Sequence, residues 1–317
     1  MPSTQTQSIG EKLLSLPLGQ DVREFLNYLT VEAGLSNNTI LGYGRDLIGF
    51  LRHCQSSGIA RLVQVKPLII QSYLRILTLS NRDENSVRRC LVAIRMFLRF
   101  AKLTGRVEDD FTAILEGPKI WQKLPVVCSK QQVVGLLEAP QPSEPFYLRD
   151  RAMLELLYAT GIRAGELAGL RTSNLNLDIG YLRCIGKGNR ERVIPVGKAA
   201  IAAITEYLIK LRPRLAKPQS RDFLLLSRTG RPLGRIDIWR LVKKYAIRAH
   251  LARPGGSRNL TAHTLRHCFA THLLAGGADL RSVQEMLGYV DIATTQIYTH
   301  VDHERLRSIH KKYHPRP

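Results

Sequence analysis

The first hundred residues carry apolar side chains at the spacing of helices rather than of strands. Val22, Phe25, Leu26 and Leu29 fall on one helix face, and a second helix is expected to begin after Ser36, a residue type that caps helix starts. This pattern predicts that the chain begins with a helical domain.

Two further helices complete this region. Pro67 suits the first turn of a third helix, and Asn85 or Ser86 is expected to cap a fourth, which Gly105 ends. The inward stripe of the fourth helix consists of Val87, Leu91, Ile94, Leu98 and Ala101. Its outer side is basic, with Arg88, Arg95, Arg99 and Lys102.

A segment rich in glycine, proline and lysine separates this helical region from the rest of the chain. We interpret residues 117–125 as a linker, so that residues 1–116 form a helical domain and residues 126–317 a second domain ending in a tail helix. A length of 317 residues fits two domains better than one.

The second domain combines helical patterns with one β element. Ser129 and Gln132 predict a capping box, and the apolar run 152–158 predicts a helix ending near Gly161. Residues 181–185 and 192–196 are rich in β-formers and flank a glycine-bearing turn, which predicts an antiparallel hairpin with Lys187 at its tip. Further helices are expected at 198–211, 235–250, 263–274, 279–287 and near 298. The fold class is therefore mainly α with a small antiparallel β element, the second domain being mixed α/β.

The charge balance is strongly basic. Lys and Arg number 47 against 26 Asp and Glu, which gives a net charge of +21 and favours a polyanionic partner, nucleic acid first. The outer face of the fourth helix is then either a surface that follows DNA phosphates or an ordinary solvated face.

Two classes of protein are disfavoured. No uninterrupted apolar stretch reaches the length of a membrane span, and the first residues lack the pattern of a signal peptide, so we expect a soluble, cytoplasmic protein with no membrane partner. The five cysteines are scattered and never spaced as C-x-x-C, which indicates reduced core thiols rather than disulfides or a thiolate zinc site.

Three positively chargeable residues suit chemistry at a phosphodiester. Cleavage without a metal needs a nucleophile, cations on the nonbridging oxygens and a proton donor for the leaving hydroxyl. Arg163 follows a glycine turn that leads into a helix, where Glu166 is suited to orient its guanidinium. His263 and Arg266 stand at i and i+3, so one helix face is expected to bring both to the same phosphate.

A metal site at the same helix is the weaker interpretation. His263 and His267 have the spacing of a zinc pair, but Thr264 stands where a zincin requires Glu. We therefore expect no metal and no cofactor, and interpret His267 and His272 as structural histidines of the core.

Tyr298 is the candidate nucleophile, although most tyrosines are simply packed. A free phenol has a pKa near 10, so a tyrosine nucleophile needs neighbouring cations or an acceptor for its proton. Arg163, Arg266 and His263 are the groups expected to supply them.

The ordered series ATGIRAGEL, GKGNRERVIPV, HTLRHCFATHLLAGGADLRSVQEMLG and TTQIYTHV resembles the tyrosine recombinases, specifically the bacterial Xer-type site-specific recombinases. The likeness extends over nearly the whole chain and is closest to the XerD branch. It implies a core-binding domain followed by a catalytic domain, and strand exchange through a 3′ phosphotyrosyl link.

The resemblance also assigns roles to single residues. It implies that Arg163, Lys187, His263 and Arg266 are catalytic, that Lys187 is the general acid, and that Tyr298 is the nucleophile. The family has His or Trp after the Leu-Gly pair where this chain has Tyr289, whose hydroxyl is able to donate to a phosphate oxygen.

The partners implied are duplex DNA at a specific recombination site, a homo- or heterotetramer with a second recombinase in which the tail helix docks on a neighbouring subunit, and a septal DNA translocase. Two alternatives stay open. One is a mobile-element integrase with the same chemistry, and the other is a DNA-binding accessory subunit whose cleavage is weak because of Tyr289.

Overall fold

The computed structural model describes residues 4–80, 82–108, 127–185, 191–252, 260–288 and 300–316. The chain divides into two compact units, Met1–Lys123 and Leu124–Pro317. The expected linker, 117–125, lies outside the described residues.

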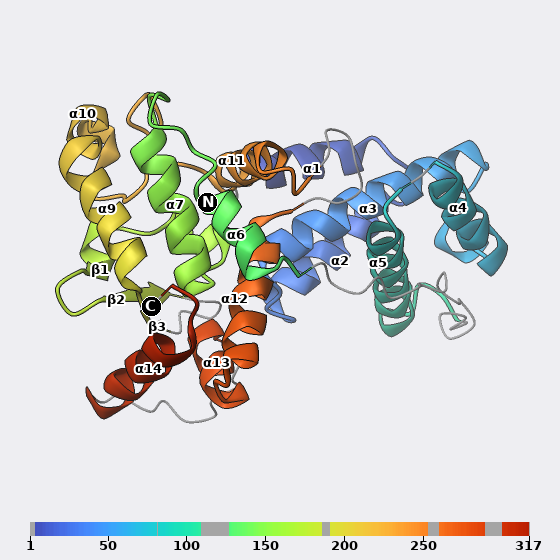
Figure 1. Ribbon diagram of the computed structural model, residues 1–317. Coiled ribbons are helices and arrows are strands. Elements are labelled where there is room, and N and C mark those ends of the chain that lie inside the picture. The colour runs from blue at the N-terminus through green and yellow to red at the C-terminus, as the bar shows by residue number, and fades with distance from the viewer. Residues whose placement is uncertain are drawn as a thin grey trace. The chain divides into compact units, whose positions relative to one another are not determined.

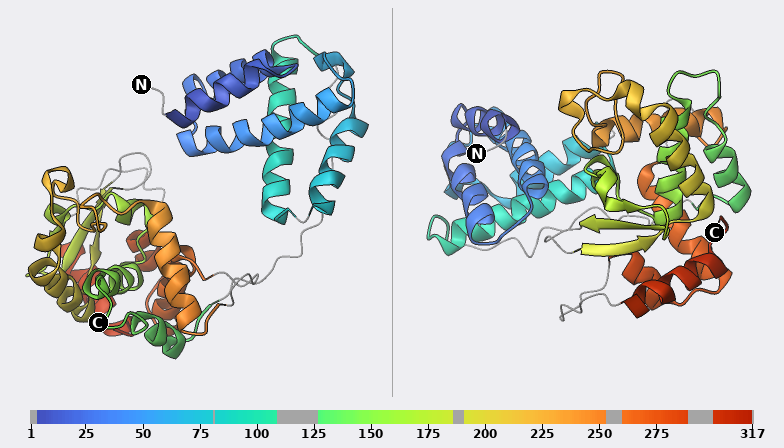
Figure 2. Two further views of the ribbon diagram at one scale, coloured as in Figure 1. Left: turned by 90° about the horizontal axis from the view of Figure 1, so that it is seen from above. Right: turned by 90° about the vertical axis from the view of Figure 1, so that its left-hand side faces the viewer.

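Helices alone build the described part of the first unit (Figures 1 and 2). They are α1 (Thr4–Leu14), α2 (Gly19–Val31), α3 (Asn37–Ser56), the short 3-10 helix η1 (Leu62–Gln64), α4 (Pro67–Leu79) and α5 (Glu84–Leu103). Helix α3 packs against α1, α2, α4 and α5, and the rings of Phe25, Phe97 and Phe100 meet in the core. The helical first domain is confirmed, with α1 as an element that the sequence pattern did not predict.

Single residues near the helix starts of this unit determine where each helix begins. Ser36 caps α3 by accepting from the Thr39 N–H, and Pro67 is the first residue of α4, as predicted. The predicted cap of α5 was wrong. Asp83 caps this helix by accepting from the Ser86 N–H, because a carboxylate just before the first turn reaches the exposed N–H groups that Asn85 and Ser86, already inside the turn, cannot.

The second unit is mixed α/β, which confirms the predicted fold class. Its elements are α6 (Lys130–Leu137), α7 (Tyr147–Thr160), α8 (Ala164–Ala168), η2 (Thr172–Asn174), β1 (Leu175–Asn176), β2 (Tyr181–Ile185), β3 (Glu191–Pro195), α9 (Lys198–Lys210), α10 (Arg212–Leu215), η4 (Pro218–Ser220), α11 (Arg235–Arg248), α12 (Ala262–Gly276), α13 (Leu280–Leu287) and α14 (His300–Tyr313). The capping box of Ser129 and Gln132 is present at the start of α6.

The three strands form an antiparallel sheet in the order β1-β2-β3, visible in the right panel of Figure 2. Leu182 of β2 pairs with Ile194 of β3, so the predicted hairpin is confirmed, with its second strand beginning one residue earlier than expected. Residues 186–190, which include Lys187, lie outside the described residues.

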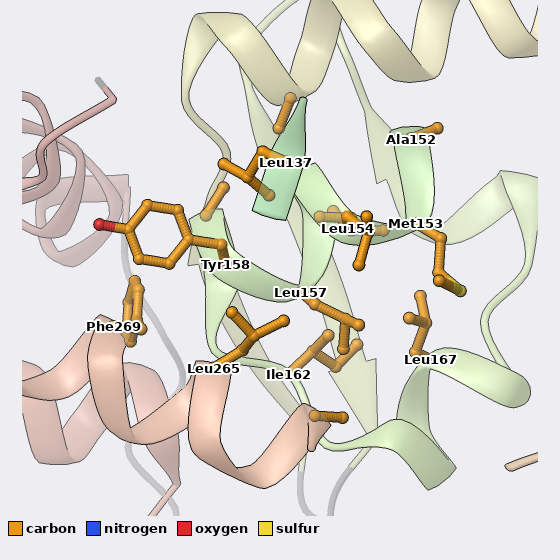
Figure 3. Packing of buried hydrophobic residues seen from close by; sticks show 14 of the residues in the cluster. Leu137, Ala152, Met153, Leu154, Leu157, Tyr158, Ile162, Leu167, Leu265 and Phe269 are labelled. Atoms are coloured by element: carbon orange, nitrogen blue, oxygen red, sulfur yellow. The ribbon is translucent and has the colours of Figure 1, made fainter. Parts of the chain in front are cut away.

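Helix α7 is the centre of the second core. Its residues 152–160 are all buried, and α7 packs against α6, α9, α12 and β3. Figure 3 shows Leu265 and Phe269 of α12 pointing toward α7, where Leu157 and Tyr158 lie. This packing fixes the end of α7, from which the candidate site begins.

The tail helix α14 packs on its own unit in this single chain, against α12, α13 and β3. Leu306 joins the core, and Nε2 of His310 donates to the carbonyl oxygen of Ala159 at 2.8 Å. Burial lowers the pKa of His310 to about 4, so this histidine is neutral at pH 7.

Two predictions about composition can be compared with the structure. All five cysteines are buried free thiols, as expected. Among the described helices, none combines the length and apolar character that crossing a membrane requires.

Candidate functional site

The site begins at the turn between α7 and α8. Gly161 ends α7 with a φ of 59°, a left-handed conformation that glycine adopts without strain. Arg163 is the N-cap of α8, and its own N–H and Nη1 both donate to the carboxylate of Glu166, each at 2.9 Å. The prediction that Glu166 orients the Arg163 guanidinium is therefore confirmed.

Arg266 ties this turn to the end of α13. Its side chain lies on α12 and is buried, with 2% of the residue exposed. Nη1 donates to the carbonyl oxygen of Gly161 at 2.7 Å, and Nη2 donates to that of Leu287 at 2.6 Å. The structure thus brings Arg266 against the backbone turn that carries Arg163.

The histidines of α12 have different environments. Helix α12 begins at Ala262, so His263 lies in its first turn and is exposed, whereas Arg266 one turn later is buried. His263 is consequently the solvent-facing member of the pair.

The sequence analysis interprets both His267 and His272 as structural histidines of the core, and the structure confirms this for His272 only. His272 is buried, with Nε2 donating to the Cys128 carbonyl and Nδ1 facing the Tyr158 hydroxyl, each at 2.9 Å. His267 is only half-buried, so it is not part of the core.

Arg192 is a buried residue of this region that the sequence analysis did not predict as part of the site. It lies on β3, and its guanidinium binds the Glu166 carboxylate through Nη1 at 3.0 Å and Nη2 at 2.7 Å. A signal for it existed in the sequence. Strand alternation puts position 192 on the same buried face as Ile194, and a charge on a buried face needs a partner.

The carboxylate of Glu166 therefore serves two arginines. Burial alone would raise the pKa of Glu166, but hydrogen bonds from Arg192 and from the Arg163 N–H, with the charge of Arg192, lower it to about 2. Arg163 and Arg192 share this carboxylate, and Arg266 binds the turn at Gly161 beside them, so three guanidinium groups stand against one carboxylate in this region, an excess of positive charge suited to an anion such as a phosphodiester.

Three predicted site residues, Lys187, Tyr289 and Tyr298, lie outside the described residues. The described range before Tyr289 closes at Gly288, which ends α13 with a φ of 69°. Within the described ranges, no group of three or more His, Cys, Asp or Glu side chains is arranged to hold a metal ion.

The basic face of the first unit lies on α5. Arg88, Arg99 and Lys102 are exposed and Arg95 is half-buried, while the predicted inward stripe of this helix is buried as expected. Arg89, the neighbour of Arg88, is held by Asp46 in a two-point ion pair, with distances of 2.7 and 3.0 Å.

Comparison with known proteins shows similarity over almost the whole chain. Residues 127–305 match the family described as Phage integrase family, and residues 22–105 match the Phage integrase, N-terminal SAM-like domain. Tyrosine recombinase XerD of Halalkalibacterium halodurans is 44% identical over 300 residues, covering 94% of this chain and 99% of the relative. Tyrosine recombinase XerD of Staphylococcus epidermidis is 42% identical over 295 residues, covering 93% and 98%.

Solved structures show the same fold. The XerH site-specific recombinase bound to palindromic difH substrate in a post-cleavage complex has a TM-score of 0.67 at 23% identity, covering 96% of this chain and 93% of that one. A lambda integrase dimer bound to a COC′ core site has a TM-score of 0.67 at 19% identity, covering 88% and 97%.

Proposed function

This chain belongs to the phage integrase family and is a tyrosine-type site-specific DNA recombinase, and we propose that Tyr298 is the nucleophile with which it cleaves DNA. The phenolic oxygen attacks the scissile phosphorus, the bond to the 5′ oxygen breaks, and a 3′ phosphotyrosyl link forms. A 5′ hydroxyl of the partner strand reverses the step, so strand exchange needs no external energy source.

The other proposed roles follow the same step. His263 accepts the phenolic proton, and the Lys187 ammonium gives a proton to the leaving 5′ oxygen. Arg163 and Arg266 stabilise charge on the nonbridging oxygens, and the Tyr289 hydroxyl donates to one of these oxygens.

The observation that carries the proposed chemistry is that Arg163 and Arg266 meet at the turn at Gly161, where both could contact one phosphate. Arg163 presents a side chain that is 41% exposed, so its guanidinium is accessible to a ligand. Arg266 binds the Gly161 carbonyl of the same turn and is buried, and low exposure makes a fixed positive charge act more strongly than in water. One accessible and one buried guanidinium at the same turn make a clamp for a phosphodiester anion.

The proposed substrate is duplex DNA at a specific recombination site. The net charge of +21 supports it, as do the structures of XerH and lambda integrase, both of which are bound to DNA. In this proposal Arg88, Arg95, Arg99 and Lys102 follow the phosphates along α5.

The relatives named XerD favour resolution of chromosome or plasmid dimers over integration of a mobile element. We accordingly propose a cytoplasmic enzyme that acts in a tetramer with copies of itself or with a second recombinase, under the control of a septal DNA translocase.

A nicked suicide duplex tests the nucleophile directly, because loss of the short 5′ strand traps the covalent link. Tyr298→Phe is expected to abolish the denaturant-resistant protein–DNA adduct while leaving specific binding within about twofold, since only one hydroxyl is removed. Tyr313→Phe, on α14 of the same unit, is the matched control and should form adduct normally. Adduct formation by Tyr298→Phe would exclude Tyr298 as the nucleophile. If the unmodified protein itself forms adduct only weakly, the accessory-subunit hypothesis is tested by adding a partner recombinase.

A further inference from the structure

Arg192 connects three separate parts of the second unit. The residue is 4% exposed on β3, and besides its two bonds to Glu166 its Nε donates to the carbonyl oxygen of Met286 at 3.1 Å. Met286 lies in the last turn of α13, directly before the Leu287 carbonyl that Arg266 binds. Two arginines from β3 and α12 thus hold consecutive carbonyl groups where α13 ends.

The Arg192 side chain packs closely against Gly288, the residue that ends α13. A Cβ atom added to Gly288 would lie 3.2 Å from Cδ of Arg192 and 3.5 Å from its Nε. The side chain therefore fills the space beside the left-handed residue from which the chain continues toward Tyr298.

Glu166 links Arg192 to the accessible Arg163. The side chain of Arg192 is 5% exposed and that of Glu166 10%, against 41% for Arg163. A two-point pair with a guanidinium is the strongest hydrogen-bonded arrangement open to a carboxylate, so Arg192 balances most of the Glu166 charge. Arg163 donates to the same carboxylate through Nη1 at 2.9 Å, and its exposed side chain is accessible to an incoming anion.

We propose that Arg192 is a positioning residue for DNA cleavage, which neutralises Glu166 so that Arg163 is available to the scissile phosphate and which anchors the end of α13. This inference rests on the proposed function of Arg163. Without Arg192, the unbalanced Glu166 carboxylate would hold Arg163 as its own partner and compete with the phosphate.

The first test is single-turnover cleavage of a suicide duplex at saturating protein. Arg192→Gln is expected to slow cleavage by about 10- to 100-fold, the loss known for residues that orient the ligands of a metal centre as Arg192 is proposed to orient Arg163 through Glu166. Arg192→Lys keeps the charge beside Glu166 without the two-point geometry and should fall between Arg192→Gln and the unmodified protein.

A matched control separates positioning from general stability. Arg149 is also buried, at 5% exposure, and binds one carboxylate, that of Asp150, and one carbonyl, that of Leu226. Arg149→Gln should lower the melting temperature about as much as Arg192→Gln but leave the cleavage rate of the folded protein within about twofold.

The second test is a rescue that a purely structural role would not produce. Glu166→Gln added to Arg192→Gln removes the carboxylate that competes for Arg163, so the double variant should cleave about tenfold faster than Arg192→Gln alone, equivalent to about 1.4 kcal/mol. If Arg192 only supported the fold, losing a second buried hydrogen-bonding group would make the double variant equal or worse.

A neutral substrate gives an independent measure. Replacing one nonbridging oxygen by methyl removes the phosphate charge that Arg163 is proposed to meet, so the defect of Arg192→Gln should shrink to within about threefold on a methylphosphonate duplex. An equal defect on both substrates would overturn the role through Arg163.

The outcomes distinguish this inference from the proposed function. Failure of the unmodified protein to form any adduct, alone or with a partner recombinase, would count against the proposed function. Normal adduct formation together with an Arg192→Gln variant that behaves like Arg149→Gln would overturn the inference alone. Failure of both Arg192 variants to fold, while Arg149→Gln folds, would make Arg192 a structural residue and would also overturn it.

Discussion

Nη2 of Arg266 donates to the carbonyl oxygen of Leu287 at 2.6 Å, which joins α12 to the last turn of α13. Leu287 is followed by Gly288, where α13 ends and the chain leads toward the candidate nucleophile. A single buried side chain is thus proposed to serve both the scissile phosphate and the backbone that carries Tyr298.

Arg266→Ala is therefore expected to damage stability and cleavage together. It leaves the buried carbonyl groups of Gly161 and Leu287 without these donors, and each unsatisfied group costs about 1–3 kcal/mol. We expect the free energy of unfolding in urea to fall by about 2–6 kcal/mol.

Arg163→Ala is the comparison variant for this prediction. Its guanidinium is partly exposed and Glu166 keeps its bonds to Arg192, so the loss of unfolding free energy should stay near 1 kcal/mol while cleavage falls as far as in Arg266→Ala. An Arg266→Ala protein of unchanged stability would contradict the bridging role.

DNA affinity should depend steeply on salt. If at least six phosphates are contacted, the binding constant should fall by about a thousandfold between roughly 50 and 200 mM salt, because bound counterions are released from DNA. Fluorescence anisotropy with a duplex that contains the recombination site measures this slope.

The α5 face can be tested residue by residue in the same titration. Arg88→Gln, Arg99→Gln and Lys102→Gln should each reduce the salt slope by about one. Arg89→Gln is the matched control, since Asp46 already holds this guanidinium, and should change the slope less. Equal effects of Arg88→Gln and Arg89→Gln would count against a specific phosphate-binding face.

Lys187→Ala should slow cleavage of an ordinary phosphodiester by about 10² to 10⁴, the usual contribution of a general acid. A thiol leaves readily as its anion, so a substrate with a 5′ sulfur at the scissile bond should restore most of the rate. Arg163→Ala and Arg266→Ala should not recover on that substrate, because the nonbridging oxygens are unchanged. If Lys187→Ala is equally slow on both substrates, Lys187 is a phosphate contact rather than the acid, and His263 and Tyr289 are the next candidates to test.

Acid should destabilise the protein below about pH 6.5 through two buried histidines of the tail, His310 on α14 and His314 directly after it. Burial, together with the nearby His310, lowers the pKa of His314 to about 3. Between that value and the ordinary pKa of 6.5 the unfolded chain binds a proton that the folded chain does not. His314 therefore makes the free energy of unfolding fall by about 1.4 kcal/mol for each pH unit lost, and the effect is absent above pH 6.5.

His314→Phe keeps the ring and removes the titration, so the slope of stability against pH between pH 4 and 6 should decrease by about 1.4 kcal/mol per unit. His250→Asn is the control, since His250 is exposed and its φ of 57° suits asparagine. Urea unfolding at several pH values measures both slopes, and identical slopes for His314→Phe and the unmodified protein would refute the prediction.

The sequence by itself determined what depends on near neighbours along the chain. Helical spacing located α3 and α5 because each stripe of apolar side chains repeats within a few residues, and the continuous apolar run 152–158 located α7. The Ser129 capping box and the bond from Arg163 to Glu166 each join residues three apart, and both were predicted. Four ordered motifs were enough to identify the family.

Only the tertiary structure decided which charged side chains are buried and what they bind. His263 and Arg266 share one helix, yet the second is buried because the carbonyl groups of Gly161 and Leu287 accept its hydrogen bonds. Arg192 stood in a recognised motif, but its role depends on Glu166 and Met286, which precede and follow it by many residues. Sequence periodicity describes one element at a time, whereas a buried charge is stable only if distant elements bring partners to it, and that arrangement exists only in the folded chain.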